Sequence, residues 1–165
     1  MEIRFKKLIP EAKLPTQGKP GDAAYDIYCA EDFELQPGET KAIATGLQLA
    51  DMPTMFGKKG PALFLQIEGR SGLAAKGIFP LGGIIDATYR GEIKVILHNG
   101  NPEHSFDFAS PIPWWTQRRE SVKFKVGDRI AQLLVRLIAS DVTMVEAEEA
   151  TETVRGSDGF GSTGQ

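Results

Sequence analysis

Short runs of apolar and β-branched residues recur along the chain, and each run is bounded by turn-forming residues. In the run 122–126 the apolar residues alternate with lysines, a period of two that is typical of a strand with one buried and one solvated face. The run 130–135 is nearly continuous and predicts a central strand covered on both faces. The whole pattern predicts strands at 3–8, 24–30, 41–50, 63–67, 92–98, 122–126, 130–138 and 142–148, with a further strand beginning at Phe33.

The pattern leaves little room for helices, because only residues 70–76 predict one, and it is short. The chain also holds 18 glycines and 10 prolines, which favours turns over long helices. Many short strands separated by frequent turns indicate an all-β barrel or sandwich. The 165 residues are expected to form one β domain over 1–154, followed by a flexible tail over 155–165.

Charge and cysteine content narrow the function classes. The net charge of −3 means that neither a nucleic-acid backbone nor an anionic membrane surface would attract the chain on average. No apolar run approaches the ~18–20 residues that span a bilayer, and the N-terminal residues do not resemble a secretory signal. One cysteine excludes an internal disulfide, and two histidines almost exclude a structural zinc site. We expect a cytoplasmic protein with no membrane partner and no direct nucleic-acid partner.

Two segments carry residues that suit binding of an anion or activation of a water. Arg70 and Ser71 stand at the start of the expected helix, where backbone N–H groups, a hydroxyl and a guanidinium suit an anion; alternatively, Ser71 is a plain N-cap. Asp86 follows the apolar residues Ile84 and Ile85, at the end of a short strand. It could orient a water as general base; alternatively, its side chain forms an Asx-turn that closes a hairpin.

Polar residues near the C-terminal end suggest further contacts. Gln132 lies within an apolar run, so it needs polar partners from the backbone or from a ligand. Asp128 and Arg129 are expected to form an ion pair that holds a turn. The tail 155–165 cannot fold alone, since Phe160 is its single large apolar residue, but its glycines, hydroxyls and arginine suit contact with phosphate.

Taken in order, five stretches resemble the five motifs of the homotrimeric dUTPase (dUTP pyrophosphatase) family. They are residues 20–28, 69–74, 83–92, 127–133 and 155–164, so that the resemblance covers almost the whole chain. It implies a distorted β jelly roll, or β-clip, that assembles as a homotrimer with exchange of the C-terminal arm. Each active site would lie between subunits, with the tail of one subunit ordering over the nucleotide in a neighbour's pocket.

The resemblance also implies roles for the residues that bind the nucleoside. Asp86 resembles the residue that positions and deprotonates the attacking water, and Tyr89 resembles the ring that packs under the deoxyribose and excludes a 2′-hydroxyl. The backbone of Gly83, Ile84 and Ile85, with the returning strand near Lys94, would read the uracil edge. The approach to this hairpin, residues 79–82, has no polar side chain, so recognition there must depend on the backbone.

Further roles implied by the resemblance concern the phosphates, the metal and the reaction. Arg70, Ser71, Gly72 and Gln132 resemble phosphate contacts from a second subunit, while Arg155, Phe160, Gly161, Ser162 and Thr163 would come from a third, with Phe160 stacking on the base. Asp26 resembles the carboxylate that touches Mg²⁺ through water, in keeping with the preference of Mg²⁺ for retaining water ligands. The implied reaction is in-line attack of water on the α-phosphorus of dUTP, which yields dUMP and pyrophosphate, keeps uracil out of DNA and supplies dUMP for dTMP synthesis.

Departures from the family pattern leave two alternatives open. Thr88 replaces the usual second aspartate of the third motif, and residues 101–120, here named the insert, lengthen the chain. The insert holds adjacent Trp114 and Trp115 next to arginines, so it either packs on its own trimer or binds a partner protein, which would make the chain a regulatory protein. The related dCTP deaminase is a further alternative, disfavoured by Tyr89 and by the Phe160 tail.

Overall fold

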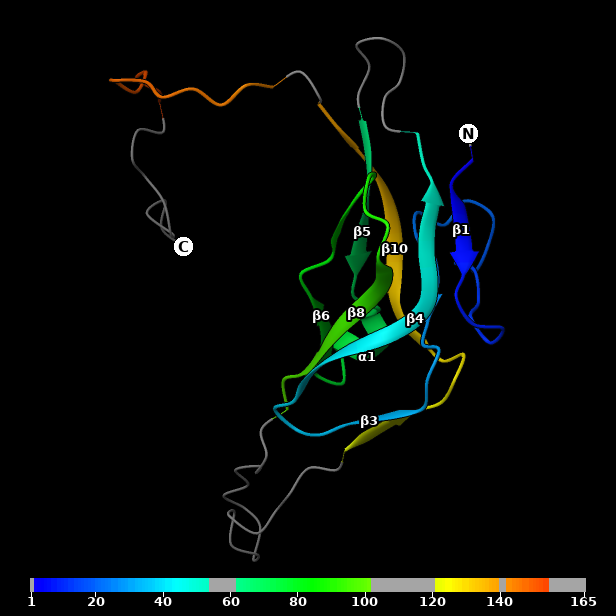
Figure 1. Cartoon of the computed structure of the whole chain (residues 1–165). Coiled ribbons are helices and arrows are strands. Elements are labelled where there is room, and N and C mark those ends of the chain that lie inside the picture. Colours follow the sequence, from blue (N-terminus) through cyan, green and yellow to red (C-terminus); the bar gives the residue numbers. More distant parts are fainter. Residues whose placement is uncertain (1, 54–61, 102–120, 140–141, 155–165) are drawn as a thin grey trace, which may run out of the picture.

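The computed structural model describes residues 2–53, 62–101, 121–139 and 142–154 (Figure 1). The insert lies outside these ranges apart from Asn101, and the whole tail lies outside them. The expectations for a partner-binding arm and for Arg155, Phe160, Gly161, Ser162 and Thr163 therefore concern residues outside the described part.

The described residues form short strands and one helical turn. In chain order the elements are β1 (Arg4–Lys7), β2 (Tyr25–Tyr28), β3 (Phe33–Leu35), β4 (Thr40–Asp51), β5 (Ala62–Glu68), α1 (Ser71–Ala74), β6 (Ile78–Leu81), β7 (Ile84–Asp86), β8 (Glu92–Asn99), β9 (Val122–Phe124) and β10 (Arg129–Ile138). The predicted all-β class is confirmed, and α1 confirms the one short helix expected from the sequence.

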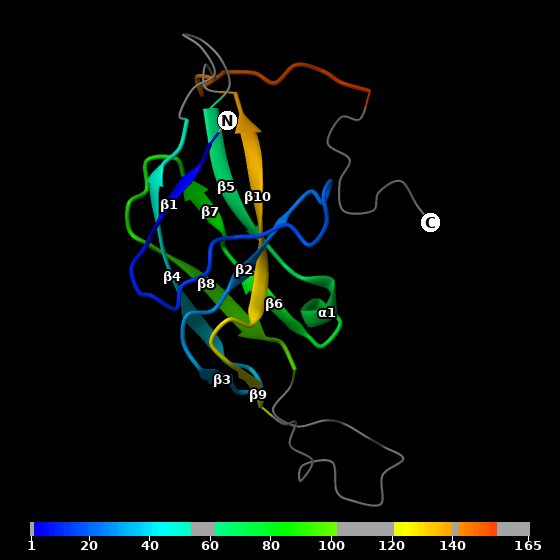
Figure 2. The ribbon, with the colours of Figure 1, turned by 90° about the vertical axis from the view of Figure 1, so that its right-hand side faces the viewer.

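Two antiparallel sheets form the layers of the domain. The first has the strand order β1-β4-β8-β6 and the second has the order β2-β10-β5-β7. A two-stranded ribbon of β3 and β9 closes one end of the molecule (Figures 1 and 2). The core between the sheets is built from aliphatic side chains of both layers, and the largest fully buried ones include Ile43, Leu65, Ile93 and Ile130. This arrangement is the distorted jelly roll expected for the chain.

Strand periodicity explains which side chains enter the core. In β5 the odd-numbered residues Leu63, Leu65 and Ile67 are buried, whereas the even-numbered ones point outward. The prediction of a central strand at 130–135 is confirmed, because β10 lies between β2 and β5. Its outer face is less covered than expected: Gln132 and Leu134 are only half-buried in the single chain.

Two features of the fold differ from the sequence-based expectations. The predicted strand at 142–148 is wrong, because these residues pair with no other strand among the described residues and all of them are exposed. Strand β6 was not predicted, since Pro80 interrupts its pattern. Pro80 is nevertheless tolerated because β6 is an edge strand, where a missing N–H on the outer side costs no hydrogen bond between strands.

A bulge in β4 sets the start of β8, on which the candidate site depends. The register between β4 and β8 shifts between Ala44 and Leu47. The Thr45 hydroxyl, fully buried there, donates to the Ile93 carbonyl at 2.6 Å, and the Gly46 N–H donates to a Glu92 carboxylate oxygen at 3.1 Å. The extra residues therefore satisfy their own polar groups and hold the first two residues of β8 in place.

Candidate functional site

The strands β7 and β8 follow each other in sequence, yet they belong to different sheets. Strand β7 pairs with β5 and forms the edge of the second sheet. Strand β8 pairs with β4 along most of its length, whereas β6 covers its other side only from Ile96 to Asn99. Within the described residues, β7 and the first half of β8 thus face each other with unpaired backbone edges. Such edges offer alternating N–H donors and carbonyl acceptors to a ligand.

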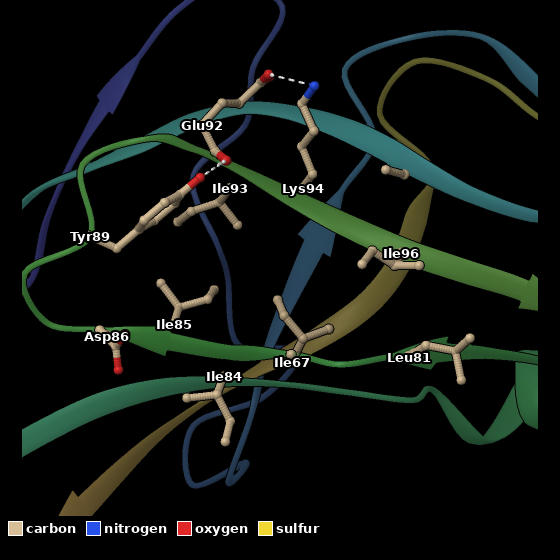
Figure 3. Close-up of a pocket in the computed structure, with 12 residues that line it drawn as sticks. Ile67, Leu81, Ile84, Ile85, Asp86, Tyr89, Glu92, Ile93, Lys94 and Ile96 are labelled. Carbon is tan, nitrogen blue, oxygen red and sulfur yellow. Dashed lines mark hydrogen bonds and ion pairs between the residues drawn. The ribbon is translucent and has the colours of Figure 1, made fainter.

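A pocket of about 660 Å³ fills the space between these two strands (Figure 3). Apart from Phe160, which lies outside the described residues, its walls hold the residues for which the sequence suggested a role in nucleoside binding or catalysis, namely Gly83, Ile84, Ile85, Asp86, Tyr89 and Lys94. Apolar side chains of Ile67, Leu81, Ile93 and Ile96 complete the lining. One chain therefore brings this first group of predicted site residues together.

Gly83 connects the two sheets at the floor of the pocket. Its carbonyl accepts the Ile67 N–H at 2.8 Å, and its φ of +116° lies in the region that favours glycine. A Cβ at this position would lie 2.8 Å from the Ile67 carbonyl oxygen. The close approach of β7 to β5 therefore requires a residue without a side chain.

A tight turn places Asp86 at the mouth of the pocket. The Tyr89 N–H donates to the Asp86 backbone carbonyl at 3.0 Å, and the Arg90 guanidinium donates to the carbonyls of Ala87 and Tyr89 at 2.8 and 3.0 Å. The backbone and Arg90 thus close the turn, and the alternative of an Asx-turn made by the Asp86 side chain is wrong. No hydrogen bond or ion pair occupies this carboxylate within the described ranges, and it is exposed.

Tyr89 is held across the same turn by the start of β8. Its hydroxyl donates to the Glu92 carbonyl at 3.1 Å, while about half of the residue stays exposed. The ring lies against Gly91, where an added Cβ would collide with the ring and the hydroxyl. Glu92 also forms an ion pair with Lys94, with 3.8 Å between Oε2 and Nζ. Figure 3 shows the Tyr89 ring and the Glu92–Lys94 pair along one wall of the pocket.

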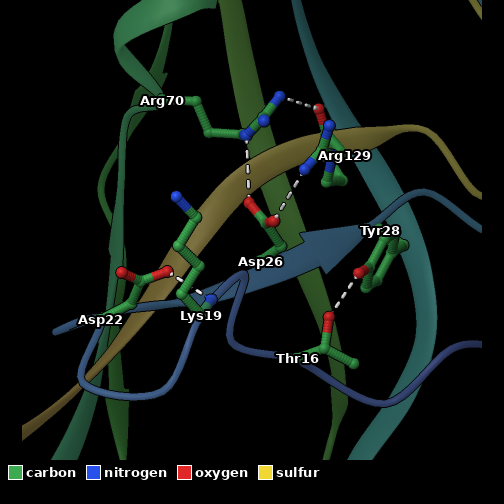
Figure 4. Close-up of polar contacts among 7 residues, drawn as sticks. All are labelled: Thr16, Lys19, Asp22, Asp26, Tyr28, Arg70 and Arg129. Atoms are coloured by element: carbon green, nitrogen blue, oxygen red, sulfur yellow. Dashed lines mark hydrogen bonds and ion pairs between the residues drawn. The ribbon is translucent and has the colours of Figure 1, made fainter.

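A second group of predicted residues surrounds Asp26, on the outer face of the second sheet and away from the pocket (Figure 4). The carboxylate accepts from Arg70 Nε at 3.1 Å and from Arg129 Nη1 at 3.3 Å. Arg70 also donates to the Arg129 carbonyl at 3.2 Å. The expected ion pair between Asp128 and Arg129 is wrong. Asp128 instead accepts the Lys125 N–H at 2.8 Å, which closes the turn without Arg129.

Ser71, Gly72 and Gln132 lie next to this ion-pair cluster. Ser71 is the first residue of α1, and Arg70 occupies the N-cap position without a side-chain capping bond, so the interpretation of Ser71 as a plain N-cap is wrong. Gln132 stands directly across from Asp26 on one side and from Glu68 on the other. Residues that face each other in this way point to the same side of a sheet, so Gln132 lies in a polar row on the outer face.

The two groups of predicted residues do not meet within one chain. Asp86 pairs with Phe64 on β5, whereas Gln132 pairs with Glu68 on the same strand. These two positions lie four residues apart along the strand, which amounts to about 13 Å. None of Arg70, Ser71, Gly72 and Gln132 lines the pocket between β7 and β8. Within one chain, the two groups therefore do not line one common pocket.

The residues of the site fit a magnesium ion only in an indirect role. In the described part of the chain, no cluster of three or more histidine, cysteine, aspartate or glutamate side chains could hold a metal. Both oxygens of Asp26 already accept from guanidinium groups, which leaves lone pairs for a water but not an open ligand set. Mg²⁺ retains waters and takes phosphate oxygens as ligands, so this arrangement suits a contact through water.

Several site residues escaped the sequence reasoning. Arg129 was assigned to a turn, and its partner Asp26 is 103 residues away, so only pairing of β2 with β10 reveals the contact. Arg90 and Gly91 lie within the third motif, but their support of the turn and of the Tyr89 ring depends on backbone geometry.

Across the described ranges, no helix has the length and apolar character that a membrane span requires.

Comparison with known proteins agrees with this arrangement. The profile of the dUTPase family matches residues 10–106 and 111–164. The deoxyuridine 5'-triphosphate nucleotidohydrolase of Thermobifida fusca is 39% identical, over 99% of this chain and 79% of that protein. The structure of the Staphylococcus bacteriophage 80alpha dUTPase with dUpNHpp is 25% identical, has a TM-score of 0.78 and is matched over 99% of both chains.

A further structure, of a mutant dUTPase from phage phi11 of S. aureus, supports the fold at 23% identity and a TM-score of 0.68, over 92% of this chain and 100% of that one. That protein coordinates a structural Mg(II) ion. The profile match along nearly the whole sequence and the 39% identity to the Thermobifida fusca protein show that this chain belongs to the dUTPase family.

Proposed function

We propose that the chain hydrolyses dUTP to dUMP and pyrophosphate, with Asp86 as the general base that deprotonates the attacking water. The observation that carries the proposal is the pocket between β7 and β8, with Asp86 and Tyr89 on one turn at its mouth. A carboxylate that is exposed and not used by the turn is available to a water. The dUTPase of phage 80alpha, to which the chain is similar, has been solved with dUpNHpp.

The two unpaired strand edges support recognition of uracil by the backbone. Uracil presents an acceptor, a donor and an acceptor along its pairing edge, which matches the alternation of N–H and C=O groups on a strand. Cytosine carries an amino donor where uracil has a carbonyl, so a buried donor would be left facing a donor. An unsatisfied polar group of this kind costs about 1–3 kcal/mol, which disfavours dCTP.

The reaction requires positioning and charge neutralisation more than covalent chemistry. The water oxygen attacks the α-phosphorus as its proton passes to Asp86. The bond from that phosphorus to the α–β bridging oxygen breaks, and pyrophosphate leaves with the bonding electron pair. Tyr89 holds the deoxyribose, which fixes the α-phosphorus relative to Asp86. Arg70, Ser71, Gly72 and Gln132 of a neighbouring copy bind the leaving phosphates.

A homotrimer would bring the two residue groups together. Phe64, Ile84, Leu134 and Ile138 form a largely apolar patch on the outer face of the second sheet, which also includes Gln66 and Arg136, and Ile84 and Ile138 are 73% and 51% exposed. Asp86 borders this patch on one side and the Asp26 cluster borders it on the other. A neighbouring copy packed on the patch would cover its apolar surface and place one copy's Asp86 near another copy's Arg70.

The residues that follow β10 support arm exchange between copies. Residues 142–154 are exposed throughout and leave the sheets (Figure 1), although they include Val142, Met144 and Val145. Apolar side chains gain stability by burial, which a single chain does not provide for these three. A groove of about 470 Å³ beside β1, lined by apolar residues that include Phe5 and Leu133, is a suitable acceptor surface on a neighbouring copy.

Magnesium is the cofactor proposed for the reaction, and when bound to the triphosphate it neutralises charge on the phosphate oxygens. Asp26 is the residue that would contact it through a water. The surrounding guanidinium groups hold the carboxylate oriented, so that it can accept a hydrogen bond from such a water.

The test is release of pyrophosphate in the presence of Mg²⁺, with dUTP, dCTP, dTTP and UTP offered separately. Hydrolysis confined to dUTP is the expected result. Release of ammonia from dCTP would instead assign the chain to the related deaminases. Absence of turnover on all four nucleotides would favour a regulatory protein that acts through the insert.

A further inference from the structure

Arg129 follows the turn at Gly127 and Asp128, but its side chain does not take part in that turn. Its guanidinium reaches Asp26 at 3.3 Å, on the opposite side of the carboxylate from Arg70. Figure 4 shows both guanidinium groups directed toward the same carboxylate. Asp26 has a side chain only 10% exposed, so it is the buried centre of the cluster. Arg129 itself remains 54% exposed, compared with 25% for Arg70.

The charges around Asp26 are unbalanced. One guanidinium is sufficient to neutralise a buried carboxylate, and the second leaves the cluster with a net charge of +1. Arginine carries five N–H donors, and the contacts of Arg129 within the described residues use a single one of its nitrogens. The Arg129 side chain is about half exposed, so its remaining donors are open to solvent. An anion is the ligand that such a surface favours.

We propose that Arg129 is a second phosphate-binding arginine, and that Asp26 is a positioning residue that holds Arg70 and Arg129 side by side. The ligand is the polyphosphate of a nucleotide whose base and sugar lie in the hairpin pocket of a neighbouring copy, so the inference rests on the proposed function. Two guanidinium groups held by one carboxylate suit a pyrophosphate unit, because each can bind oxygens of a different phosphate.

Geometry favours a polyphosphate over other anions. Arg70 is held twice, by Asp26 and by the Arg129 carbonyl, and Arg129 is held once, by Asp26, so one carboxylate directs both guanidinium groups before a ligand arrives. Preorganised donors lose little conformational entropy on binding. Extended nucleic acid is disfavoured because the net charge of the chain is −3.

The test measures binding of inorganic pyrophosphate by calorimetry, with the intact protein and without divalent ions, so that a metal contact of Asp26 does not contribute. Arg129→Gln is expected to weaken this binding by about tenfold or more, the effect of one lost charge-assisted hydrogen bond. Arg129→Lys is expected to recover part of the loss. Arg4→Gln is the matched control, since Arg4 is also an exposed arginine that is paired with a carboxylate, at 2.9 Å from Glu2, and it should bind as the wild type does.

The variant Asp26→Asn distinguishes a role of Asp26 in positioning the two arginines from the effect of its negative charge on anion binding. Removal of a negative charge would strengthen pyrophosphate binding if the arginines kept their places, whereas loss of their positioning weakens it, and weaker binding is expected. In steady-state assays, Arg129→Gln should raise KM for dUTP and the inhibition constant of pyrophosphate and leave the inhibition constant of dUMP unchanged.

The outcomes distinguish the inference from the proposed function. Wild-type hydrolysis of dUTP together with unchanged pyrophosphate affinity in Arg129→Gln would overturn the role of Arg129 and leave the activity intact. Absence of dUTP hydrolysis by the wild type would overturn the proposed function, while the calorimetric comparison of variants would still decide whether Arg129 binds polyphosphate.

Discussion

At the scale of single residues, the chemistry depends on a turn that leaves the side chain of Asp86 unused. The backbone carbonyl of Asp86 closes the turn, and the Arg90 guanidinium braces it from outside. The carboxylate is therefore held at a defined place without being consumed as a structural group. A general base needs this combination of fixed position and available lone pairs.

Replacement of Asp86 by asparagine removes the base and keeps the shape. We expect kcat for dUTP to fall by about 10²–10⁴-fold, the usual contribution of general base catalysis. The dissociation constant of dUpNHpp, which has an imido group at the α–β bridge, should change little. Thr88→Ala is the control, because Thr88 lies on the same turn without a proposed role. Comparable losses in both variants would assign Asp86 to the structure of the turn.

Gly91 is expected to control sugar selectivity through Tyr89. A methyl group at Gly91 collides with the Tyr89 ring, so Gly91→Ala should displace the ring from the pocket wall. The ratio of kcat/KM for dUTP to that for UTP is expected to fall by about tenfold or more, because a small displacement of a group that positions the substrate has a large effect on rate. The comparison uses pyrophosphate release from both nucleotides.

Tyr89→Phe is the matched variant for this measurement. It keeps the ring and removes the hydroxyl that donates to the Glu92 carbonyl at 3.1 Å. A small loss of kcat/KM for dUTP is expected, because only one neutral hydrogen bond is removed, and the sugar selectivity should be retained. Equal selectivity in Gly91→Ala and the wild type would contradict the role of the ring.

At the scale of elements, the β3–β9 ribbon is held by charges as well as by backbone bonds. Asp32, just before β3, accepts from Lys125 Nζ at 2.7 Å and from the Val126 N–H at 2.9 Å, and these bonds lower the pKa of its carboxyl group. The Ser121 hydroxyl lowers the pKa of Glu34 in the same ribbon. Asp32 in turn raises the pKa of Lys125. The stacked rings of Phe33 and Phe124 add an apolar contact.

The lowered pKa values predict loss of stability in acid. A carboxyl group with a lowered pKa stabilises the folded state above its ordinary pKa, here 3.8 for Asp32 and 4.5 for Glu34, and the stabilisation disappears as the pH falls through the lowered values. Lys125 acts in the opposite direction, and its contribution disappears as the pH rises through a pKa above 10.5.

Asp32→Asn tests this pH dependence by thermal unfolding. The variant should have a lower Tm than the wild type at pH 7, and the difference should shrink as the pH falls below 3.8 and the wild-type carboxyl group becomes protonated as well. The difference at pH 7 should be small and should shrink with added salt, since the pair is exposed. Glu2→Gln is the control for a surface ion pair on β1, outside the ribbon. A Tm difference that stays constant with pH would exclude the charge of Asp32 as its cause.

At the scale of the whole molecule, the two groups of site residues do not line one pocket within a single chain. They are separated along β5, with Asp86 opposite Phe64 and Gln132 opposite Glu68. The apolar patch between them is the surface that a second copy would cover. Activity is therefore expected to be a property of the assembly and to require contributions from different copies.

Mixed trimers test this expectation directly. Asp86→Asn and Arg70→Gln should each be inactive or nearly so as homotrimers. When the two variants are refolded together in equal amounts, about a quarter of the sites would combine an intact Asp86 with an intact Arg70 from the next copy. Recovery of pyrophosphate release to that level supports shared sites. Absence of recovery in trimers shown to be mixed would mean that each chain works alone.

Most of the fold and half of the residues that line the pocket could be predicted from the sequence. Alternation of apolar residues placed β9 correctly, because burial on one face of a strand leaves a period of two in the sequence, and a nearly continuous apolar run placed the central strand β10. The motif around Asp86 is contiguous, so its residues had to lie near one another. Local steric and hydrophobic rules act over a few residues and can be read directly from the order of the side chains.

The tertiary structure alone decided which distant residues meet. It assigned Arg129 to Asp26, put β7 and β8 in different sheets with unpaired edges, and left residues 142–148 without a strand partner within the described part of the chain. Each of these outcomes depends on the pairing of strands far apart in the chain, or on a neighbour that a single chain lacks. Long-range pairing is selected by the packing of the whole core, which no local pattern specifies.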